Sequence, residues 1–224
     1  MEDLKVMINI LYEDNHILVV EKPVNMPVQE DESKDMDLLN LLKKYLKEKY
    51  NKPGNVYLGL IHRLDRPVGG VMVFAKTSKA ASRLSEQMRK RKIEKKYYAV
   101  VLGNISQEEG TYVDKLKKDE KKNQVFISQD GKEAILHYQL VGKYEKFSLV
   151  RVSLETGRPH QIRVQFSYHG YPLYGDQKYN SLAKPGQQIA LFSYYLTFYH
   201  PITKEKMEFQ LKIPSKYPWN LFNM

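Results

Sequence analysis

The stretch HRLDRPVGGVMVFA, residues 62–75, contains one carboxylate, Asp65, followed by two glycines and an apolar run. The apolar run at residues 71–75 is rich in β-branched residues and predicts a strand. Gly69 and Gly70 indicate a tight backbone just before that strand, where a carboxylate could be held in a fixed direction. An isolated Asp is more often a member of a surface ion pair, and on this stretch alone both interpretations stay open.

A second stretch, TGRPHQIR at residues 156–163, supplies arginines beside a glycine. A carboxylate that acts as a nucleophile must be ionised, so it needs a nearby cation to oppose the rise in its pKa on burial. Arg163 is a candidate for that cation, and an ordinary helix-surface pair or a phosphate contact is the alternative. Together the two stretches suit an acid-dependent reaction on an anionic substrate.

Strands and helices alternate along the rest of the chain. The pattern predicts a hairpin from residues 7–12 and 16–20, a helix capped by Asp37 that ends before Pro53, and a second helix that begins at Ser78. Further strands are expected at 97–102, 134–143, 147–154, 189–199 and 207–213, with a charged loop at 115–123. Pro159 is expected in the first turn of a helix that Gly170 ends. We therefore expect one α+β domain over residues 1–224, with a mixed, largely antiparallel central sheet flanked by helices and loops.

Charge and cysteine content narrow the function. The formal net charge is +10 over 224 residues, which favours a polyanionic partner, although an ordinary basic enzyme has the same property. The basic run at residues 89–92 is either an RNA contact or a solvated helix end. A chain without cysteine has no disulfide, thiolate zinc site or cysteine nucleophile. The acidic N-terminal residues lack a signal-peptide pattern and no apolar run reaches membrane length, so we expect a cytoplasmic protein.

The sequence lacks the residue patterns that are typical of several other enzyme classes. A glycoside hydrolase usually needs two acidic groups, and only Asp65 is a persuasive candidate. The histidines show no metal-ligand spacing, so we predict no metal site. The sequence also has no glycine-rich loop for a dinucleotide or a nucleoside triphosphate, and we expect no cofactor.

Four motifs in order resemble the RluA family of RNA pseudouridine synthases. They are ILYEDNHILVVEKP at residues 10–23, HRLDRPVGGVMVFAKT at 62–77, KKYYAVVLG at 95–103 and LETGRPHQIRVQFSYHGYPLYGDQKY at 154–179. The resemblance covers nearly the whole chain. It implies the pseudouridine synthase catalytic fold, an isomerase that acts on uridine in ribosomal or transfer RNA, and an enzyme that uses neither a metal nor a cofactor.

The resemblance also implies roles for single residues. Asp65 stands at the position of the catalytic aspartate, which attacks either the ribose or the uracil while the base is detached, rotated and rejoined through carbon. Arg63 stands where an arginine enters the RNA stack as the target uridine is flipped out. Tyr97 matches the active-site tyrosine, which is expected to stack on the uracil and to assist a proton transfer, although it could also be a half-buried strand aromatic. Arg163 matches the basic residue that pairs with the catalytic carboxylate.

The other matched residues are expected at the substrate cleft: His62, Arg158, His160 and Gln161. Three departures from the family pattern stand out. The family commonly has Thr-Ser-Gly where this chain has residues 68–70, and Asn25 and Gln29 replace a frequent glycine and histidine. Many relatives carry a small N-terminal RNA-binding domain, for which too few residues precede Lys22. We therefore expect the catalytic domain or a partner to select the RNA, and we expect a monomer.

Two other functions remain alternatives at the level of sequence. An RNA-binding or chaperone-like protein would bind RNA in a salt-sensitive way without isomerising it. A glycosidase-like hydrolase would release free uracil and leave an abasic ribose.

Overall fold

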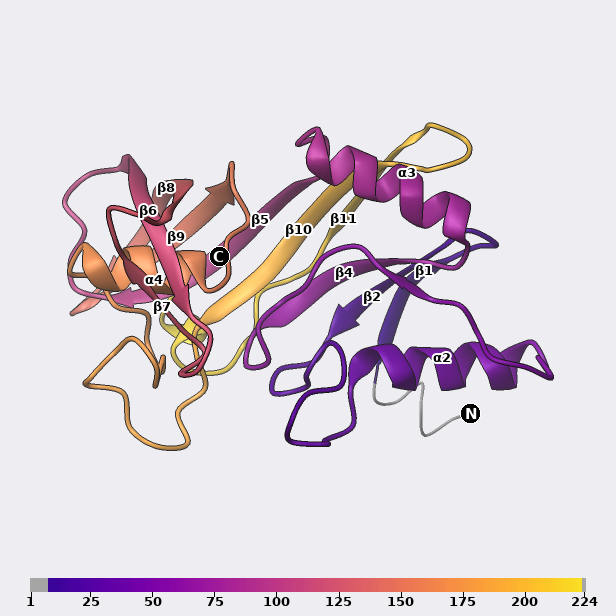
Figure 1. The fold of residues 1–224 in the computed structure, drawn as a ribbon. Coiled ribbons are helices and arrows are strands. Elements are labelled where there is room, and N and C mark those ends of the chain that lie inside the picture. The colour runs from indigo at the N-terminus through magenta and orange to yellow at the C-terminus, as the bar shows by residue number, and fades with distance from the viewer. Residues whose placement is uncertain (1–7, 223–224) are drawn as a thin grey trace. The chain divides into compact units, whose positions relative to one another are not determined.

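The structure, a computed structural model, describes residues 8–222, and these divide into two units (Figure 1). Unit 1 contains the chain up to Glu94 together with Tyr195–Leu211, and unit 2 contains Lys95–Tyr194 and the chain from Lys212 onward. Expectations that involve residues 1–7, including the N-terminal pattern and the first residue of the predicted hairpin, lie outside the described residues.

Unit 1 is built on short antiparallel strands, and the apolar residues of the strands at 17–22, 69–75 and 195–199 are mostly buried. The strands are β1 (Asn9–Glu13), β2 (Ile17–Lys22), β3 (Gly59–Leu60), β4 (Gly69–Ala75), the residues of β10 (Leu191–Tyr199) from Tyr195 onward, and β11 (Lys206–Gln210). β1 pairs with β2, β2 and β3 pair with β4, and β10 pairs with β11. The predicted N-terminal hairpin and the strand after Asp65 are both confirmed.

Two helices cover the strands of unit 1. The side chain of Asp37 accepts a hydrogen bond from the Asn40 amide and caps α2 (Leu38–Lys49), as predicted. The second helix, α3 (Ser78–Arg89), packs Leu84 against Val19 and Val73 within one apolar cluster. Figure 1 shows α2 on the side of these strands away from α3. The buried leucines of α2 and Leu84 of α3 therefore contribute the apolar faces of both helices to the core of unit 1.

Glu13 joins β1 to α2 and to the residue after β4. Burial alone would raise its pKa, but hydrogen bonds from Lys49, Lys76, Tyr50 and Tyr45 lower that pKa to about 2. The ionised carboxylate therefore stabilises the packing of these elements over the whole physiological pH range.

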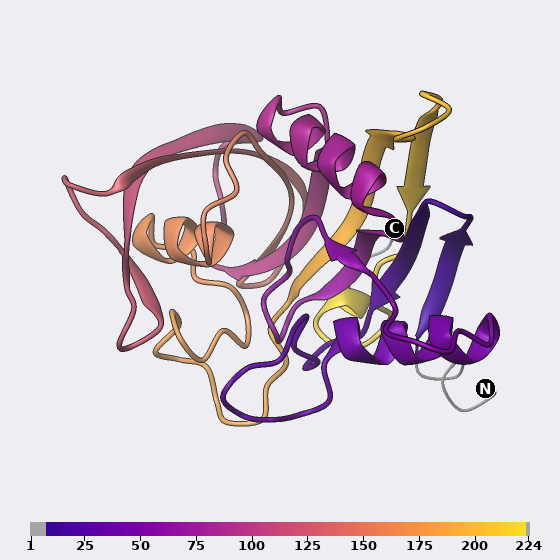
Figure 2. The same ribbon diagram turned by 45° about the vertical axis from the view of Figure 1, so that its right-hand side comes forward.

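Unit 2 contains longer antiparallel strands that curve around a short helix (Figure 2). The strands are β5 (Glu94–Leu102, in this unit from Lys95), β6 (Glu109–Asp119), β7 (Gln124–Ile127), β8 (Lys132–Tyr144) and β9 (Phe147–Leu154), paired in the order β5-β9-β8-β6-β7. The helix is α4 (Gln161–Tyr168), and a short 3-10 helix, Trp219–Leu221, lies near the end of the described chain. The central Phe166 of α4 is fully buried.

Two local predictions in unit 2 are wrong. Residues 115–119 belong to β6 instead of a loop, because Leu116 is buried while the lysines on either side of it point to the solvent. Pro159 precedes α4 instead of forming its first turn, because His160 adopts a left-handed conformation with φ of 51° and the helix begins only at Gln161. The predicted stop is confirmed, since Gly170 follows the last turn with φ of 86°.

No helix among residues 8–222 is both long and apolar enough to cross a membrane.

Candidate active site

The loop that carries Asp65 lies in unit 1 and ends at the start of β4. The Asp65 carbonyl accepts a hydrogen bond of 2.9 Å from the Val68 amide, which closes a tight turn. Gly70 pairs with Lys22 of β2 and has φ of 130°, a conformation that only glycine adopts without strain. The carboxylate is therefore attached to a turn that is anchored directly to the sheet.

Lys22 is a second anchor of this loop. Its side chain is 1% exposed, and Nζ donates to the carbonyl oxygens of Met26 at 2.7 Å, Pro23 at 2.9 Å and Arg66 at 3.0 Å. Burial lowers the pKa of Lys22 to about 7, and the Asp65 carboxylate acts in the opposite direction. Lys22 thus ties the turn after β2 to the residue next to Asp65 and places an ammonium group in the field of the candidate nucleophile.

The departures from the family pattern have local physical explanations. Asn25 has φ of 62°, in the left-handed region that asparagine tolerates better than most residues, so it can replace a glycine there. Val68 is 2% exposed, and its amide closes the Asp65 turn, which requires no side-chain hydroxyl. The loop geometry therefore does not depend on the two hydroxyl groups that are common in the family.

The other predicted residues of this loop differ in exposure. His62 is buried, and its Nε2 accepts a hydrogen bond from the Val73 amide at 3.2 Å, so the ring holds the loop to β4. Arg63 is exposed, as a residue that enters an RNA stack would need to be. Arg66 pairs with Asp35, on a different loop of the same unit. The substrate contacts of His62 and Arg63 stay predictions.

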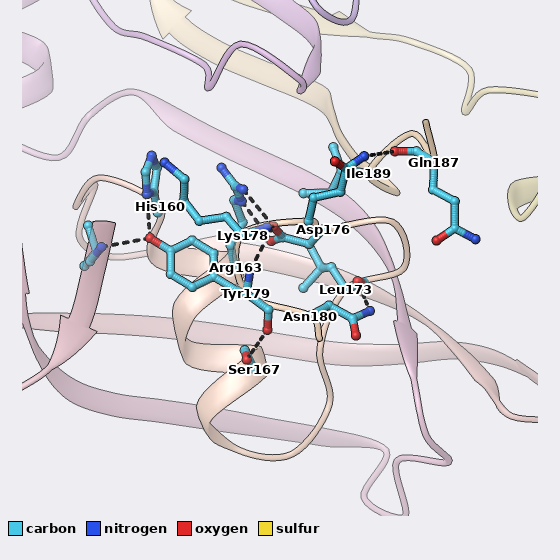
Figure 3. Close-up of polar contacts among 12 residues, drawn as sticks. His160, Arg163, Ser167, Leu173, Asp176, Lys178, Tyr179, Asn180, Gln187 and Ile189 are labelled. Atoms are coloured by element: carbon cyan, nitrogen blue, oxygen red, sulfur yellow. Dashed lines mark hydrogen bonds and ion pairs between the residues drawn. The ribbon is translucent and has the colours of Figure 1, made fainter. Parts of the chain in front are cut away.

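Arg163 lies on α4 in unit 2, where it forms a buried fork with Asp176 (Figure 3). Nε donates to Oδ2 at 2.8 Å and Nη2 donates to Oδ1 at 2.7 Å, and both side chains are almost fully buried. This geometry is the bidentate pairing that fixes a guanidinium most firmly. Asp65 and Arg163 belong to different units, and their pairing stays a prediction.

The ring of Tyr179 packs against the guanidinium of the same arginine. The Arg163 guanidinium carbon lies 5.1 Å from the centre of the Tyr179 ring, and the Tyr179 hydroxyl lies 2.7 Å from His160 Nδ1. Asp176 Oδ1 also accepts hydrogen bonds from the backbone amides of Lys178 and Tyr179, at 3.0 and 3.3 Å. Figure 3 shows these side chains converging beside α4. The segment 176–179 therefore fixes the position of Arg163.

Arg158 and Gln161 stabilise the approach to α4. Gln161 Oε1 accepts a hydrogen bond from the Thr156 hydroxyl at 2.9 Å and another from the Arg158 amide at 3.0 Å. Arg158 Nε donates to the Glu133 carbonyl at 2.8 Å. Arg158, His160 and Gln161 therefore each have a clear contact within the fold, in the same segment as Arg163. Their contacts with substrate stay predictions.

Tyr97 lies on β5, where it is 5% exposed and pairs with Val152 of β9. Lys95, two residues earlier, points to the same side of the strand, and burial lowers its pKa. A Cβ atom on Gly157 would lie 3.9 Å from Lys95 Nζ, which places this ammonium beside the TGRPHQIR stretch.

Four residues with roles at the site were missed in the sequence: Lys22, Lys95, Asp176 and Tyr179. All four fall within the motifs quoted above, so the motif match was the available signal. Their burial and their partners were not available from spacing, because each contact joins residues that lie far apart in sequence or belong to an irregular turn.

Replacing Lys22 by methionine is expected to lower the free energy of unfolding by about 2 kcal/mol, because three carbonyl groups lose their donor. Urea unfolding followed by circular dichroism measures this change. Lys90→Met removes an exposed ammonium from the same unit, paired only with the exposed Glu86, and should change the free energy of unfolding much less. Equal losses in the two variants would contradict the anchoring role of Lys22.

Comparison with protein families and curated sequences gives a consistent result. The family model described as RNA pseudouridylate synthase matches residues 16–168. The chain is 36% identical over 231 residues to an uncharacterized RNA pseudouridine synthase of Aquifex aeolicus, covering 95% of this chain and 72% of that protein. It is 34% identical over 227 residues to the ribosomal large subunit pseudouridine synthase D of Yersinia pestis, covering 94% of this chain and 68% of that protein.

Solved structures share the fold. Human RNA pseudouridylate synthase domain containing 4 superposes with a TM-score of 0.78 at 22% identity, covering 95% of this chain and 90% of that chain. Human RNA pseudouridylate synthase domain containing 1 gives a TM-score of 0.74 at 24% identity, covering 92% and 84%. The predicted α+β fold class is confirmed.

Proposed function

The chain belongs to the RNA pseudouridylate synthase family and is an isomerase that acts on RNA, and we propose that it converts uridine to pseudouridine with Asp65 as the nucleophile. One observation carries this proposal. The family match at residues 16–168 contains Asp65, Tyr97 and Arg163, the three residues to which the motif resemblance gives roles in the reaction.

In the proposed reaction the ionised Asp65 attacks the ribose or the uracil of a flipped-out uridine. The uracil is then detached at its N1, rotated and rejoined to the ribose through C5, and any bond to Asp65 is broken again. The C5 proton leaves to solvent and N1 takes up a proton, so the product is an isomer of the starting RNA. The Asp65 carboxylate opposes the lowering of the Lys22 pKa by burial, so the two groups interact electrostatically. Arg163 is the proposed cation partner of Asp65, and its fork with Asp176 supports that role by holding the guanidinium in one orientation.

Other predicted residues act on the substrate in this proposal. Tyr97 stacks on the flipped uracil, and Arg63 occupies the space that the base leaves in the RNA stack. His62, Arg158, His160 and Gln161 shape the cleft around the nucleotide. Their contacts within the fold support this role because they fix the backbone on which the reacting groups are placed.

The relatives point to ribosomal RNA as the first substrate to test. Ribosomal large subunit pseudouridine synthase D of Yersinia pestis and of Pseudomonas aeruginosa are named for that RNA, at 34% and 33% identity. Transfer RNA is the other proposed substrate class. Either substrate would place the enzyme in the cytoplasm. We further propose that residues 1–224 act as one catalytic domain, as a monomer, without a metal or a cofactor.

Release of tritium from RNA labelled at uridine C5 tests the reaction. The RNA should come from cells that lack this protein, with ribosomal and transfer RNA assayed separately, since formation of a bond to C5 expels the label. Release without free uracil supports isomerisation. Free uracil with an abasic ribose would indicate a hydrolase. RNA binding without tritium release by a folded protein would contradict the proposal and favour an RNA-binding protein.

A further inference from the structure

The β6–β7 hairpin exposes one side that we call the hairpin face, formed by Val113, Lys115 and Lys117 of β6 and by Phe126 of β7. Lys117 and Phe126 are directly paired across the two strands, so their side chains share one face of the sheet. Phe126 is 44% exposed and Val113 is 61% exposed. An aromatic ring beside lysines on an exposed ribbon is the combination that binds single-stranded nucleic acid.

The opposite side of the hairpin is buried, which fixes the orientation of the exposed side. Leu116 and Val125 are 5% and 3% exposed, and they pack with Ala134 and with Val164 of α4. Since side chains alternate along a strand, the burial of these two residues directs Lys117 and Phe126 outward. The exposure of Phe126 is therefore built into the register of the hairpin.

The charge of the hairpin suits a polyanion. Residues 115–133 contain six lysines and four acidic residues. Lys117 is paired with Asp130, but both side chains are about half exposed, so this pair contributes little to stability and can open. Lys121 and Lys122 are exposed at the turn between the strands.

The hairpin is also attached to the segment that holds Arg163. The Val125 amide donates to the Tyr179 hydroxyl at 2.8 Å, and Lys178 Nζ donates to the Asn123 carbonyl at 2.7 Å. The ring of Tyr179 lies against the Arg163 guanidinium, as Figure 3 shows. A ligand on the hairpin face would therefore be held by the same rigid framework that fixes the proposed catalytic arginine.

We propose that the hairpin face and the turn beside it bind a single-stranded segment of the substrate RNA outside the reacting uridine, with a base stacked on Phe126 and phosphates on Lys117 and on Lys121 and Lys122 of the turn. This inference rests on the proposed function for the identity of the substrate. The contact with Phe126 would select RNA that has unpaired bases available for stacking.

Fluorescence provides a direct test of stacking. The variant Phe126→Trp should lose a large part of its added emission when polyuridylate is titrated in, because a base covers the indole. Tyr144→Trp is a matched control, since Tyr144 is equally exposed at 44% and lies near the β8–β9 turn of the same unit. The native Trp219 is buried and common to both proteins. Equal responses from positions 126 and 144 would overturn the proposal.

Binding measurements test the separate contributions of the ring and the lysines. Phe126→Ala should weaken polyuridylate binding about tenfold. The pair Lys121→Gln and Lys122→Gln should reduce the slope of log affinity against log salt by about 1.4. The control pair is Lys143→Gln, at the end of β8, and Lys146→Gln, in the β8–β9 turn, and it should leave both quantities nearly unchanged.

The outcomes separate this inference from the proposed function. Polyuridylate binding does not require isomerisation, so a catalytically inactive protein can still show quenching at position 126. If the wild-type protein releases tritium and the Phe126→Ala variant binds RNA as tightly as the wild type does, the hairpin proposal alone is overturned. Quenching by polyglutamate as strong as that by polyuridylate would also overturn it, because the face would then bind any polyanion.

Discussion

Replacing Asp65 by asparagine is expected to lower the single-turnover rate of pseudouridine formation by more than about a thousandfold, because an amide cannot replace the carboxylate as nucleophile. The fold should be kept, since the turn uses the backbone carbonyl of Asp65 and the amide of Val68. Tritium release from C5-labelled RNA measures the rate, and the melting temperature measures the fold. Most RNA affinity should also remain, because the phosphate contacts are made by other residues.

Asp35→Asn is the matched control for this experiment. Asp35 is another carboxylate of unit 1 and pairs with Arg66, the neighbour of Asp65, at an exposed position. Its replacement makes the same chemical change without removing the proposed nucleophile, so activity should stay within about twofold. Substantial turnover by Asp65→Asn, or an equal loss in both variants, would contradict the role of Asp65.

Replacing Asp176 by asparagine should have the largest effect on stability, lowering the free energy of unfolding by about 3 kcal/mol. Asp176 is 1% exposed and Arg163 is 6% exposed, so the substitution removes a charge from a buried pair and leaves the guanidinium without this counterion. The single-turnover rate should fall about tenfold or more, because the orientation of Arg163 is no longer fixed. Urea unfolding and single-turnover tritium release at saturating RNA measure the two effects.

A surface pair in the same unit controls for the loss of a carboxylate. Asp130→Asn breaks the exposed pair with Lys117 and should leave the urea midpoint of unfolding nearly unchanged. Arg163→Met completes the series, since it removes the proposed partner of Asp65 directly and should also slow turnover. An unchanged single-turnover rate in both Asp176→Asn and Arg163→Met would show that the arginine plays no part in the reaction.

The sequence predicted those parts of the fold in which local pattern and burial agree. The helix after Asp37 and the strand at 71–75 were predicted correctly because each has a clear cap or a continuous apolar run. The hairpin at 115–127 was missed because only two buried residues, Leu116 and Val125, stand among lysines that outweigh them in composition. Pairing with β8 supplies the stability that local propensity does not.

The candidate site shows the same division. Asp65, Tyr97 and Arg163 were identified by motif, but Asp176 and Lys22 act through buried contacts that spacing does not reveal. The start of α4 shows why a preference can mislead, since Pro159 suits a first helical turn and the left-handed His160 nevertheless delays the helix. At Asn25 the mismatch with the family motif keeps the backbone conformation that glycine usually provides.

The division of the chain between the two units restricts how this enzyme can be dissected or altered by gene engineering. Unit 1 is assembled from two stretches, residues 8–94 and 195–211 among those described, and strand β10 passes from one unit into the other at residue 194. A stop codon after Glu94 would therefore leave unit 1 without β11. A start at Lys95 would leave β11, which belongs to unit 1, attached to unit 2. Isolating either unit requires an internal excision with a new linker, and a simple truncation series would yield only incomplete folding units.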